Sequence, residues 1–153
     1  MVIIGSDHGG YELKEQLLQF LSEVDKVEDI GCYSPDAVDF SDIAELIAVK
    51  VLESQGARGI AICGSGIGIS IAVNRFPGIY AALVHSGEQS KEITRLSRQH
   101  NNANVLCLGG RFMDLEEAKV VIQTFLQTEH LKEEPKYARR MTKTDALKIK
   151  EGR

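Results

Sequence analysis

The chain has 153 residues, of which 43% are hydrophobic and 26% are charged, and its net charge is −4 at pH 7. These values are typical of a single globular domain with an ordinary core. The negative charge argues against a general binder of nucleic acid or of an anionic membrane surface.

The N-terminus enters an apolar strand at once and lacks the basic region and long apolar core of a signal peptide. No apolar run approaches the length that crosses a membrane. The three cysteines form no C-x-x-C pair, which argues against both a zinc site and a disulfide framework. We therefore expect a soluble protein of the reducing cytoplasm, with neither a nucleic acid nor a membrane as partner.

Apolar runs and helical spacing predict strands that alternate with helices along the whole chain. In chain order we expect a strand at Val2–Ile4, a helix at Tyr11–Ser22, a strand at Val27–Ile30, a helix at Ser41–Ser54, a strand at Ile60–Ile62, a helix start at Ile69–Asn74, a strand at Tyr80–Val84, a helix at Glu88–Arg98, a strand at Val105–Leu108, a helix capped by Asp114 and, after a break at Pro135, a charged helix over about Tyr137–Lys150. Such alternation predicts one α/β domain over residues 1–153, with a parallel sheet between two layers of helices.

The strand at Ile60–Ile62 leads into Cys63 and then into a glycine-rich loop, Gly64–Gly68, before the next helix begins. In this order, bare backbone N–H groups converge on one point, which favours an anion. Cys63 is expected near a helix N-terminus, a position that favours the thiolate. An anion hole beside a base suits chemistry that passes through an enediolate. The alternative is that Cys63 is an inert packing residue at the end of a strand.

The glycine spacing does not fit a nucleotide-binding loop. In the G-x-G-x-x-G pattern the third glycine falls at Ile69 or Ile71, and the loop follows the third predicted strand rather than the first. Nothing resembles G-x-x-x-x-G-K-[ST] either. A nucleotide-dependent enzyme is therefore disfavoured.

Other polar residues also follow predicted strands: Asp7-His8 follows the first, His85 the fourth and Arg111 the fifth. Because ligands bind at the carboxyl ends of parallel strands, we expect these residues to gather near Cys63. For Asp7 a local capping role is an equally good interpretation. His85 is the weakest candidate, because a histidine at a strand end is often structural.

The remaining histidines and cysteines carry less information. His100 lies in a polar exit, Gln99–Asn102, where a histidine often serves only as a partner of the helix dipole. His130 is expected in solvent, Cys107 in the core, and Cys32 in a turn without an evident base. The histidines show no metal-ligand spacing, so we expect no metal.

The C-terminal region places a basic stripe on one face of a helix, formed by Lys136, Arg139, Arg140 and Lys143. A solvated face is the usual explanation of such a stripe. A phosphate site is the alternative, because arginine suits bidentate phosphate contacts.

Three blocks of sequence, at residues 5–14, 63–75 and 97–106, together resemble the ribose-5-phosphate isomerase B family, which is related to the galactose-6-phosphate isomerase subunits. The resemblance spans about residues 2–145. It implies a five-stranded doubly wound domain that interconverts ribose 5-phosphate and ribulose 5-phosphate without metal or other cofactor. It also implies a homodimer or a dimer of dimers, whose active sites draw residues from both chains. The C-terminal helix, about 136–150, is then expected at the dimer interface.

The resemblance also assigns roles by position. Cys63 matches the base that moves a proton between C2 and C1, and His100 matches the group that opens the sugar ring. The loop whose N–H groups hold the developing enediolate is matched by Gly64, Ser65, Gly66, Ile67 and Gly68. Ser65 stands where relatives often have threonine, and its hydroxyl can relay protons between the sugar oxygens. The matches for binding the sugar hydroxyls are Asp7 and Asn101, and those for binding phosphate are His8, Arg111, Lys136 and Arg140.

Two positions depart from the family pattern. Phe40-Ser41 stands where relatives commonly carry a tyrosine before a proline, and Lys136 replaces the first of two arginines spaced four apart. These changes leave room for a 6-phosphohexose isomerase acting on galactose or allose phosphates. A catalytically silent phosphosugar-binding module is a further alternative, but it has no use for a thiol base at Cys63.

Overall fold

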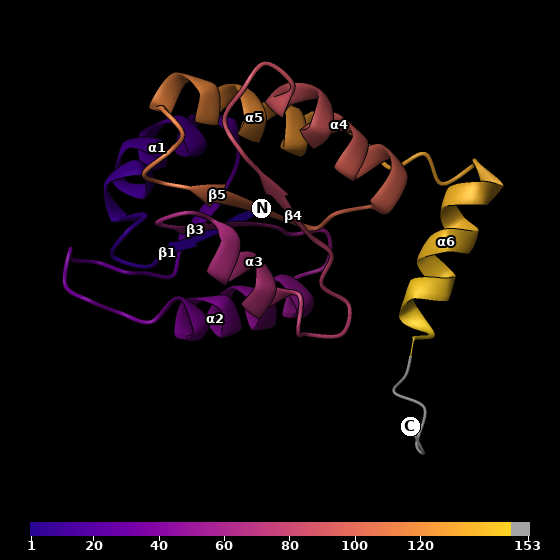
Figure 1. Cartoon of the computed structure of the whole chain (residues 1–153), viewed down its shortest axis with the longest axis horizontal. Helices are drawn as coiled ribbons and strands as arrows, with labels where there is room; N and C mark the ends of the chain where they lie inside the picture. Colours follow the sequence, from indigo (N-terminus) through magenta and orange to yellow (C-terminus); the bar gives the residue numbers. More distant parts are fainter. Residues whose placement is uncertain (148–153) are drawn as a thin grey trace.

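Five parallel strands form one sheet in the order β2-β1-β3-β5-β4 (Figure 1). The computed structural model describes residues 1–147. The strands are β1 (Val2–Ser6), β2 (Val27–Asp29), β3 (Arg58–Cys63), β4 (Ala81–Val84) and β5 (Val105–Gly109). Strands β1, β3 and β5 are almost wholly buried, because helices cover both faces of the sheet.

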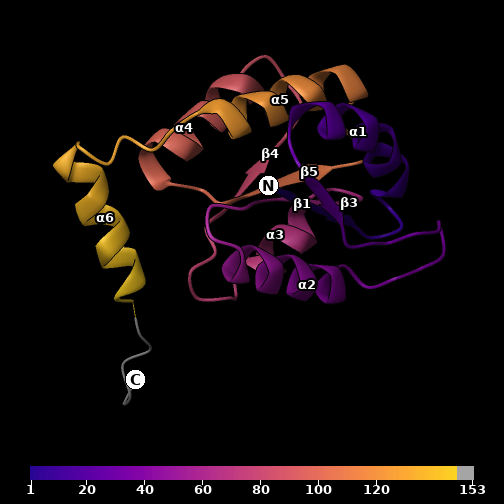
Figure 2. The ribbon, with the colours of Figure 1, turned by 180° about the vertical axis from the view of Figure 1, so that it is seen from behind.

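Six helices complete the described part of the chain: α1 (Tyr11–Val24), α2 (Phe40–Glu53), α3 (Ile67–Val73), α4 (Ser90–Asn101), α5 (Leu115–Gln127) and α6 (Pro135–Asp145). Helices α1, α4 and α5 cover one face, and α2 and α3 cover the other (Figures 1 and 2). The predicted doubly wound αβα sandwich with an extra C-terminal helix is therefore confirmed.

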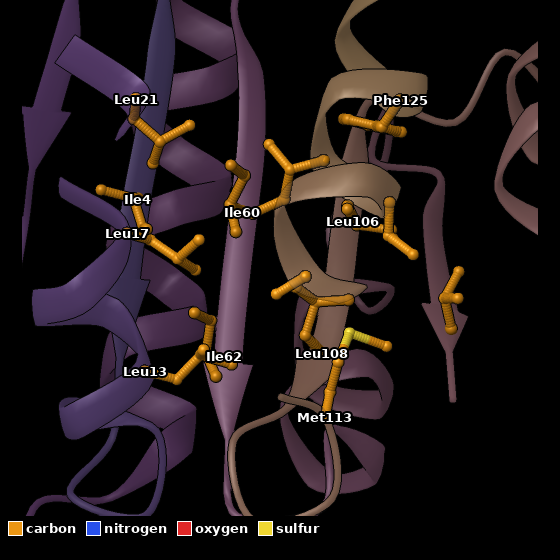
Figure 3. Close-up of a cluster of buried hydrophobic side chains, with 14 of the residues drawn as sticks. Ile4, Leu13, Leu17, Leu21, Ile60, Ile62, Leu106, Leu108, Met113 and Phe125 are labelled. Atoms are coloured by element: carbon orange, nitrogen blue, oxygen red, sulfur yellow. The ribbon is translucent and has the colours of Figure 1, made fainter. Parts of the chain in front are cut away.

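Alternation along the strands divides the core between the two faces. Ile60 and Ile62 of β3 pack with α1 and α5, whereas Ala61 and Cys63 pack with α2 and α3. Figure 3 shows the first of these clusters, with Phe125 of α5 at one end. The second cluster places Cys63 against the layer that contains the glycine loop.

Several predicted boundaries differ from the structure, and two of them concern expected site residues or α6. Helix α4 continues to Asn101, so His100 lies in its last turn and not in a loop. Pro135 does not break the chain but begins α6, because the first turn of a helix does not use the N–H that proline lacks. The last predicted residues of the C-terminal helix, 148–150, lie outside the described residues.

Helix α6 stands apart from the sandwich, beside the C-terminal end of α4 (Figures 1 and 2). The connecting segment, residues 128–134, is held to α4 by the Leu131 amide, which donates to the carbonyl of Gln99 at 3.0 Å. Tyr137 is the buried residue of α6. None of the helices within residues 1–147 has the length and apolar character needed to cross a membrane.

Candidate active site

A pocket of about 440 Å³ opens at the carboxyl edge of the sheet, beside the ends of β1 and β3. This is where chain connections leave β1 and β3 in opposite directions, the usual ligand position in doubly wound sheets. The residues that line it are Asp7, His8, Gly9, Phe40, Cys63, Gly64, Ser65, Gly68, Arg111 and Phe112. The structure thus brings together the residues expected after the first, third and fifth strands.

Cys63 ends β3 and is 4% exposed. Its Sγ accepts a hydrogen bond from the Gly66 amide at 3.1 Å. This amide points back at the sulfur because Gly66, the residue before α3, has φ of 77°, a left-handed conformation that favours glycine. Ser65 lies between them, and its Oγ accepts from the Ile67 amide at 3.2 Å.

The loops around the pocket pack backbone against backbone. A Cβ at Gly9 would lie 2.8 Å from the backbone nitrogen of Gly64, so a side chain there would separate the two loops. The Arg111 amide donates to the carbonyl of Gly64 at 3.1 Å, and its guanidinium lies directly beside that glycine. A cationic side chain therefore borders the glycine loop.

Asp7 is 6% exposed, and its Oδ1 accepts hydrogen bonds from the amides of Gly9 at 2.8 Å and Gly10 at 3.1 Å. One carboxylate oxygen of Asp7 therefore has a local structural role in the loop, although the N-cap residue of α1 is Gly10. Its Oδ2 has no hydrogen-bond partner within residues 1–147 and can meet a ligand. His8 is exposed, with Nδ1 3.2 Å from the carbonyl oxygen of Val38.

The other expected site residues are not near Cys63 in this chain. A helix that connects parallel strands runs back along the sheet, so the C-terminal end of α4, with His100 and Asn101, lies at the opposite edge (Figure 1). There the ring of His100 stacks on Tyr137 of α6, with 4.2 Å between centroids and 18° between planes. Lys136 and Arg140 are exposed on the same helix.

Of the remaining expectations for single residues, one is confirmed and two are wrong. Cys107 is fully buried in the core as expected, and burial raises the pKa of its thiol. His85 is exposed at the end of edge strand β4 and does not line the pocket, so it does not join Cys63. His130 is half-buried rather than solvated: its Nε2 is buried without a hydrogen-bond partner in the described chain. Burial, with a smaller contribution from Arg98, lowers the pKa of His130.

Three pocket residues were not among the predicted site residues: Gly9, Phe40 and Phe112. Gly9 follows Asp7-His8 directly, so its position beside the pocket could have been inferred from the motif. Phe40 comes from the start of α2, and nothing in the sequence indicates that its ring lies against Gly68, where a Cβ would be 2.9 Å from it.

A larger cavity of about 600 Å³ lies between α6 and the turn at Asn74–Tyr80. Tyr80 donates a hydrogen bond to Asp145 at its border, and burial together with this carboxylate raises the pKa of Tyr80 to about 12. Neither a cysteine nor a histidine is among the described residues that line this cavity, so it does not hold the thiol expected as the base. In the part of the chain described, no three His, Cys, Asp or Glu side chains are grouped to hold a metal ion.

The fold and the pocket define a doubly wound α/β protein with a glycine-rich loop next to a thiol. The family model described as Ribose/Galactose Isomerase matches residues 2–144. Ribose-5-phosphate isomerase B of Escherichia coli is 39% identical over 130 residues, which cover 84% of this chain and 85% of that protein.

Solved structures agree with the sequence matches. A ribose 5-phosphate isomerase from Thermotoga maritima superposes with a TM-score of 0.87 at 39% identity, over 95% of this chain and 97% of that one. Ribose-5-phosphate isomerase B from Mycoplasma genitalium, with bound ribulose-5-phosphate, gives 0.85 at 37% identity, over 95% and 93% of the two chains. The chain therefore belongs to the ribose/galactose isomerase family and is an isomerase.

Proposed function

We propose that this enzyme interconverts ribose 5-phosphate and ribulose 5-phosphate through a cis-enediolate. The observation that carries the proposal is the Cys63 thiol, which lies in the pocket beside the glycine loop. Its sulfur accepts a hydrogen bond from the Gly66 amide at 3.1 Å. A pocket that only bound a phosphosugar would have no use for a base at this point. The relative from Mycoplasma genitalium, which carries bound ribulose-5-phosphate, supports the choice of sugar.

In the proposed reaction Cys63 removes the proton from C2 of the open-chain aldose and returns it to C1. The electron pair of the C2–H bond forms the C1–C2 double bond, and the carbonyl oxygen O1 takes the negative charge. Backbone N–H groups of the loop Gly64–Gly68 stabilise this oxyanion. The proton on O2 passes to O1 through the hydroxyl of Ser65. The net change is one proton moved between carbons and one between oxygens.

Ring opening and substrate positioning use the other residues. His100 donates and accepts the proton that opens the furanose, while Asp7 and Asn101 bind sugar hydroxyls. Phosphate is bound by His8, Arg111, Lys136 and Arg140. Binding energy from the remote phosphate positions the reacting carbons.

Because His100 and Cys63 lie at opposite edges of the sheet, the proposed site uses His100 of a second copy of the chain. Lys136 and Arg140 share α6 with Tyr137, which stacks on His100, so they approach the site from the same copy. The functional unit is therefore a homodimer or a dimer of dimers, with α6 near the interface.

A 6-phosphohexose isomerase is the second candidate. It is favoured by Phe40, which lines the pocket with a ring that has no hydroxyl to offer a pentose. The larger sugar would place more of its carbon skeleton near this apolar wall.

The test is ketose formation by the purified enzyme from ribose 5-phosphate, galactose 6-phosphate and allose 6-phosphate, without added metal. We expect turnover of the pentose, and a loss of at least about 100-fold in kcat for Cys63→Ala with KM nearly unchanged. Cys107→Ala is the matched control, because it removes a core thiol outside the pocket. Preference for a hexose would favour the second candidate, and undiminished turnover by Cys63→Ala would exclude Cys63 as the base.

A further inference from the structure

A lysine is buried on α1, the helix that directly follows the first loop of the pocket, although it does not line the pocket. The side chain of Lys14 in α1 is 0% exposed, and its Nζ donates to Asp29 Oδ2 at 2.6 Å and Glu15 Oε1 at 2.7 Å. The rings of Tyr11 and Tyr33 lie 5.8 and 5.7 Å from the ammonium. Burial lowers the pKa of Lys14, but the two carboxylates outweigh this and raise it, so the side chain is a cation at neutral pH. A buried charge is tolerated only with such partners, so its position is closely defined.

Asp29 connects this cation to the backbone beside the pocket. Its second oxygen, Oδ1, accepts the Gly31 amide at 3.0 Å. Gly31 and Cys32 then hold Ser6 from both sides: the Ser6 amide donates to the Gly31 carbonyl at 2.6 Å, and the Cys32 amide donates to the Ser6 carbonyl at 2.7 Å. Ser6 is the residue before Asp7. These two backbone hydrogen bonds therefore fix the position of the main chain that carries the Asp7 carboxylate.

The same segment forms part of the pocket wall further on. Val38 lies against His8, with its carbonyl oxygen 3.2 Å and its amide nitrogen 3.4 Å from Nδ1. Two residues later Phe40 lines the pocket. The segment from Gly31 to Phe40 therefore meets the first loop of the pocket both before and after Asp7.

We propose that Lys14 is a positioning residue for the pocket: by holding Asp29, it sets the path of residues 31–40, which in turn hold Ser6, Asp7 and His8 in place. The role concerns this enzyme's catalysis only if the pocket is the isomerase site proposed above. Lys14 itself touches no substrate.

The test replaces Lys14 by methionine, which keeps the length of the side chain and removes its charge. We expect kcat/KM per folded molecule to fall about tenfold, because the charge-assisted hydrogen bonds from Lys14 to Asp29 and Glu15 are lost. We also expect the amides of Ser6 and Cys32 to exchange hydrogen about tenfold faster, while those of β3 keep their wild-type rates.

Asp29→Asn tests the residue that links Lys14 to the Gly31 amide. Since Lys14 acts through Asp29, the double variant Lys14→Met with Asp29→Asn should lose no more activity than Lys14→Met alone. Additive losses would show that the two residues act separately and would overturn the proposal.

Lys50→Met is the matched control. Lys50 forms an ion pair at 2.7 Å with Glu28, the neighbour of Asp29 on β2, but its side chain is 43% exposed. The same chemical change at an exposed pair should leave both kcat/KM and the exchange of Ser6 and Cys32 at wild-type values.

The hydrogen-exchange arm needs no substrate, so it separates this proposal from the proposed function. If the wild-type enzyme turned over no phosphosugar, the function would fail, while faster exchange confined to Ser6 and Cys32 would still support the connection. Unchanged exchange at these amides in Lys14→Met, or exchange accelerated equally in every strand, would overturn the role of Lys14 even in an active isomerase.

Discussion

At the scale of single residues, the pocket depends on glycines that let main chains approach each other. Gly66 is the clearest case, because its left-handed conformation directs its amide to the Cys63 sulfur. A Cβ at Gly66 would lie 2.7 Å from a methyl carbon of Leu83 and 2.8 Å from the carbonyl carbon of Leu108. Both the backbone angle and the lack of space therefore require glycine.

We expect Gly66→Ala to lower the free energy of unfolding by about 3 kcal/mol, from left-handed strain and the clash with Leu108 together. The activity of the folded fraction should fall as well, because relief of the clash moves the amide away from Cys63. Urea unfolding and kcat/KM measure the two effects.

Gly56→Ala separates strain from crowding. Gly56 has the same φ of 77°, yet a Cβ there would meet nothing within 4 Å. This variant should lose about 1 to 2 kcal/mol and keep full activity. Equal losses at the two positions would show that crowding at Gly66 is unimportant.

The sequence predicted Cys63 and its loop because strand, glycines and helix are consecutive, and local chemistry indicates an anion site. It did not predict that Phe40 lies on Gly68, because this contact depends on how α2 packs against α3. It also left two interpretations of Asp7 open, and the structure shows why. One carboxylate oxygen accepts hydrogen bonds from two loop amides, and the other has no partner within residues 1–147.

At the scale of elements, α5 ends without a basic residue in its last turn. Two arginines from elsewhere in the chain donate hydrogen bonds to the carbonyls at this end instead. Arg58 donates to the carbonyls of Phe125 at 2.6 Å and Leu126 at 2.7 Å, and Arg98 donates to that of Thr128 at 3.1 Å. Burial and the nearby Arg58 lower the pKa of Arg98 to about 10, which still leaves it charged at neutral pH. These contacts hold the beginning of segment 128–134, which leads to α6.

His130 in this segment makes stability depend on pH. Its pKa is lowered in the folded state, so the unfolded chain binds the proton more readily. This contribution is fully favourable above the ordinary histidine pKa of about 6.5 and is lost as pH falls below it. His130→Asn should therefore reduce the loss of unfolding free energy between about pH 7.5 and pH 5.5.

Urea unfolding at both pH values measures this difference. His85→Asn is the control, because His85 is exposed, and it should keep the wild-type loss. A loss in His130→Asn equal to that of the wild type would contradict the assignment.

Helix α6 carries two adjacent arginines that test the proposed phosphate site. Arg140→Ala should raise KM for ribose 5-phosphate about tenfold with little change in kcat, because a charge-assisted hydrogen bond to phosphate is lost. Arg139→Ala is the matched control, and its KM should stay within about twofold of the wild type. The reverse result would assign phosphate binding to Arg139.

Element types were predictable throughout, whereas some boundaries were not. The polar run Gln99–Asn102 predicts an exit from the helix, yet polar residues also fit an exposed last turn, and α4 continues to Asn101. Pro135 predicts a break because proline cannot continue a helix from within. Which role it takes depends on whether a helix follows, and here α6 does.

At the scale of the whole molecule, the central fact is the distance between the two proposed catalytic groups. The sequence gives the order of Cys63 and His100 along the chain. It does not show that Cys63 lies at the carboxyl ends of the strands and His100 at their amino ends. The direction of α4 decides this, since a connecting helix returns to the edge where the next strand begins. Two copies are then needed to complete one proposed site.

The proposed dimer can be tested by mixing two variants, Cys63→Ala and His100→Gln. Each alone should be nearly inactive. When the two chains are unfolded and refolded together, half of the dimers pair unlike chains, and each of these has one site with both native groups. Activity should return to roughly a quarter of the wild-type value. No recovery, with mixed dimers shown to form, would contradict a site shared between chains.

The position of His100 far from Cys63 therefore has a consequence for inheritance. A cell with two damaged copies of the gene, one lacking the thiol and one lacking the imidazole, would regain growth that depends on this isomerase. Two copies lacking the same group would not. Mutations would sort into two complementation groups within one gene, and this sorting would assign each residue to its half of the shared site.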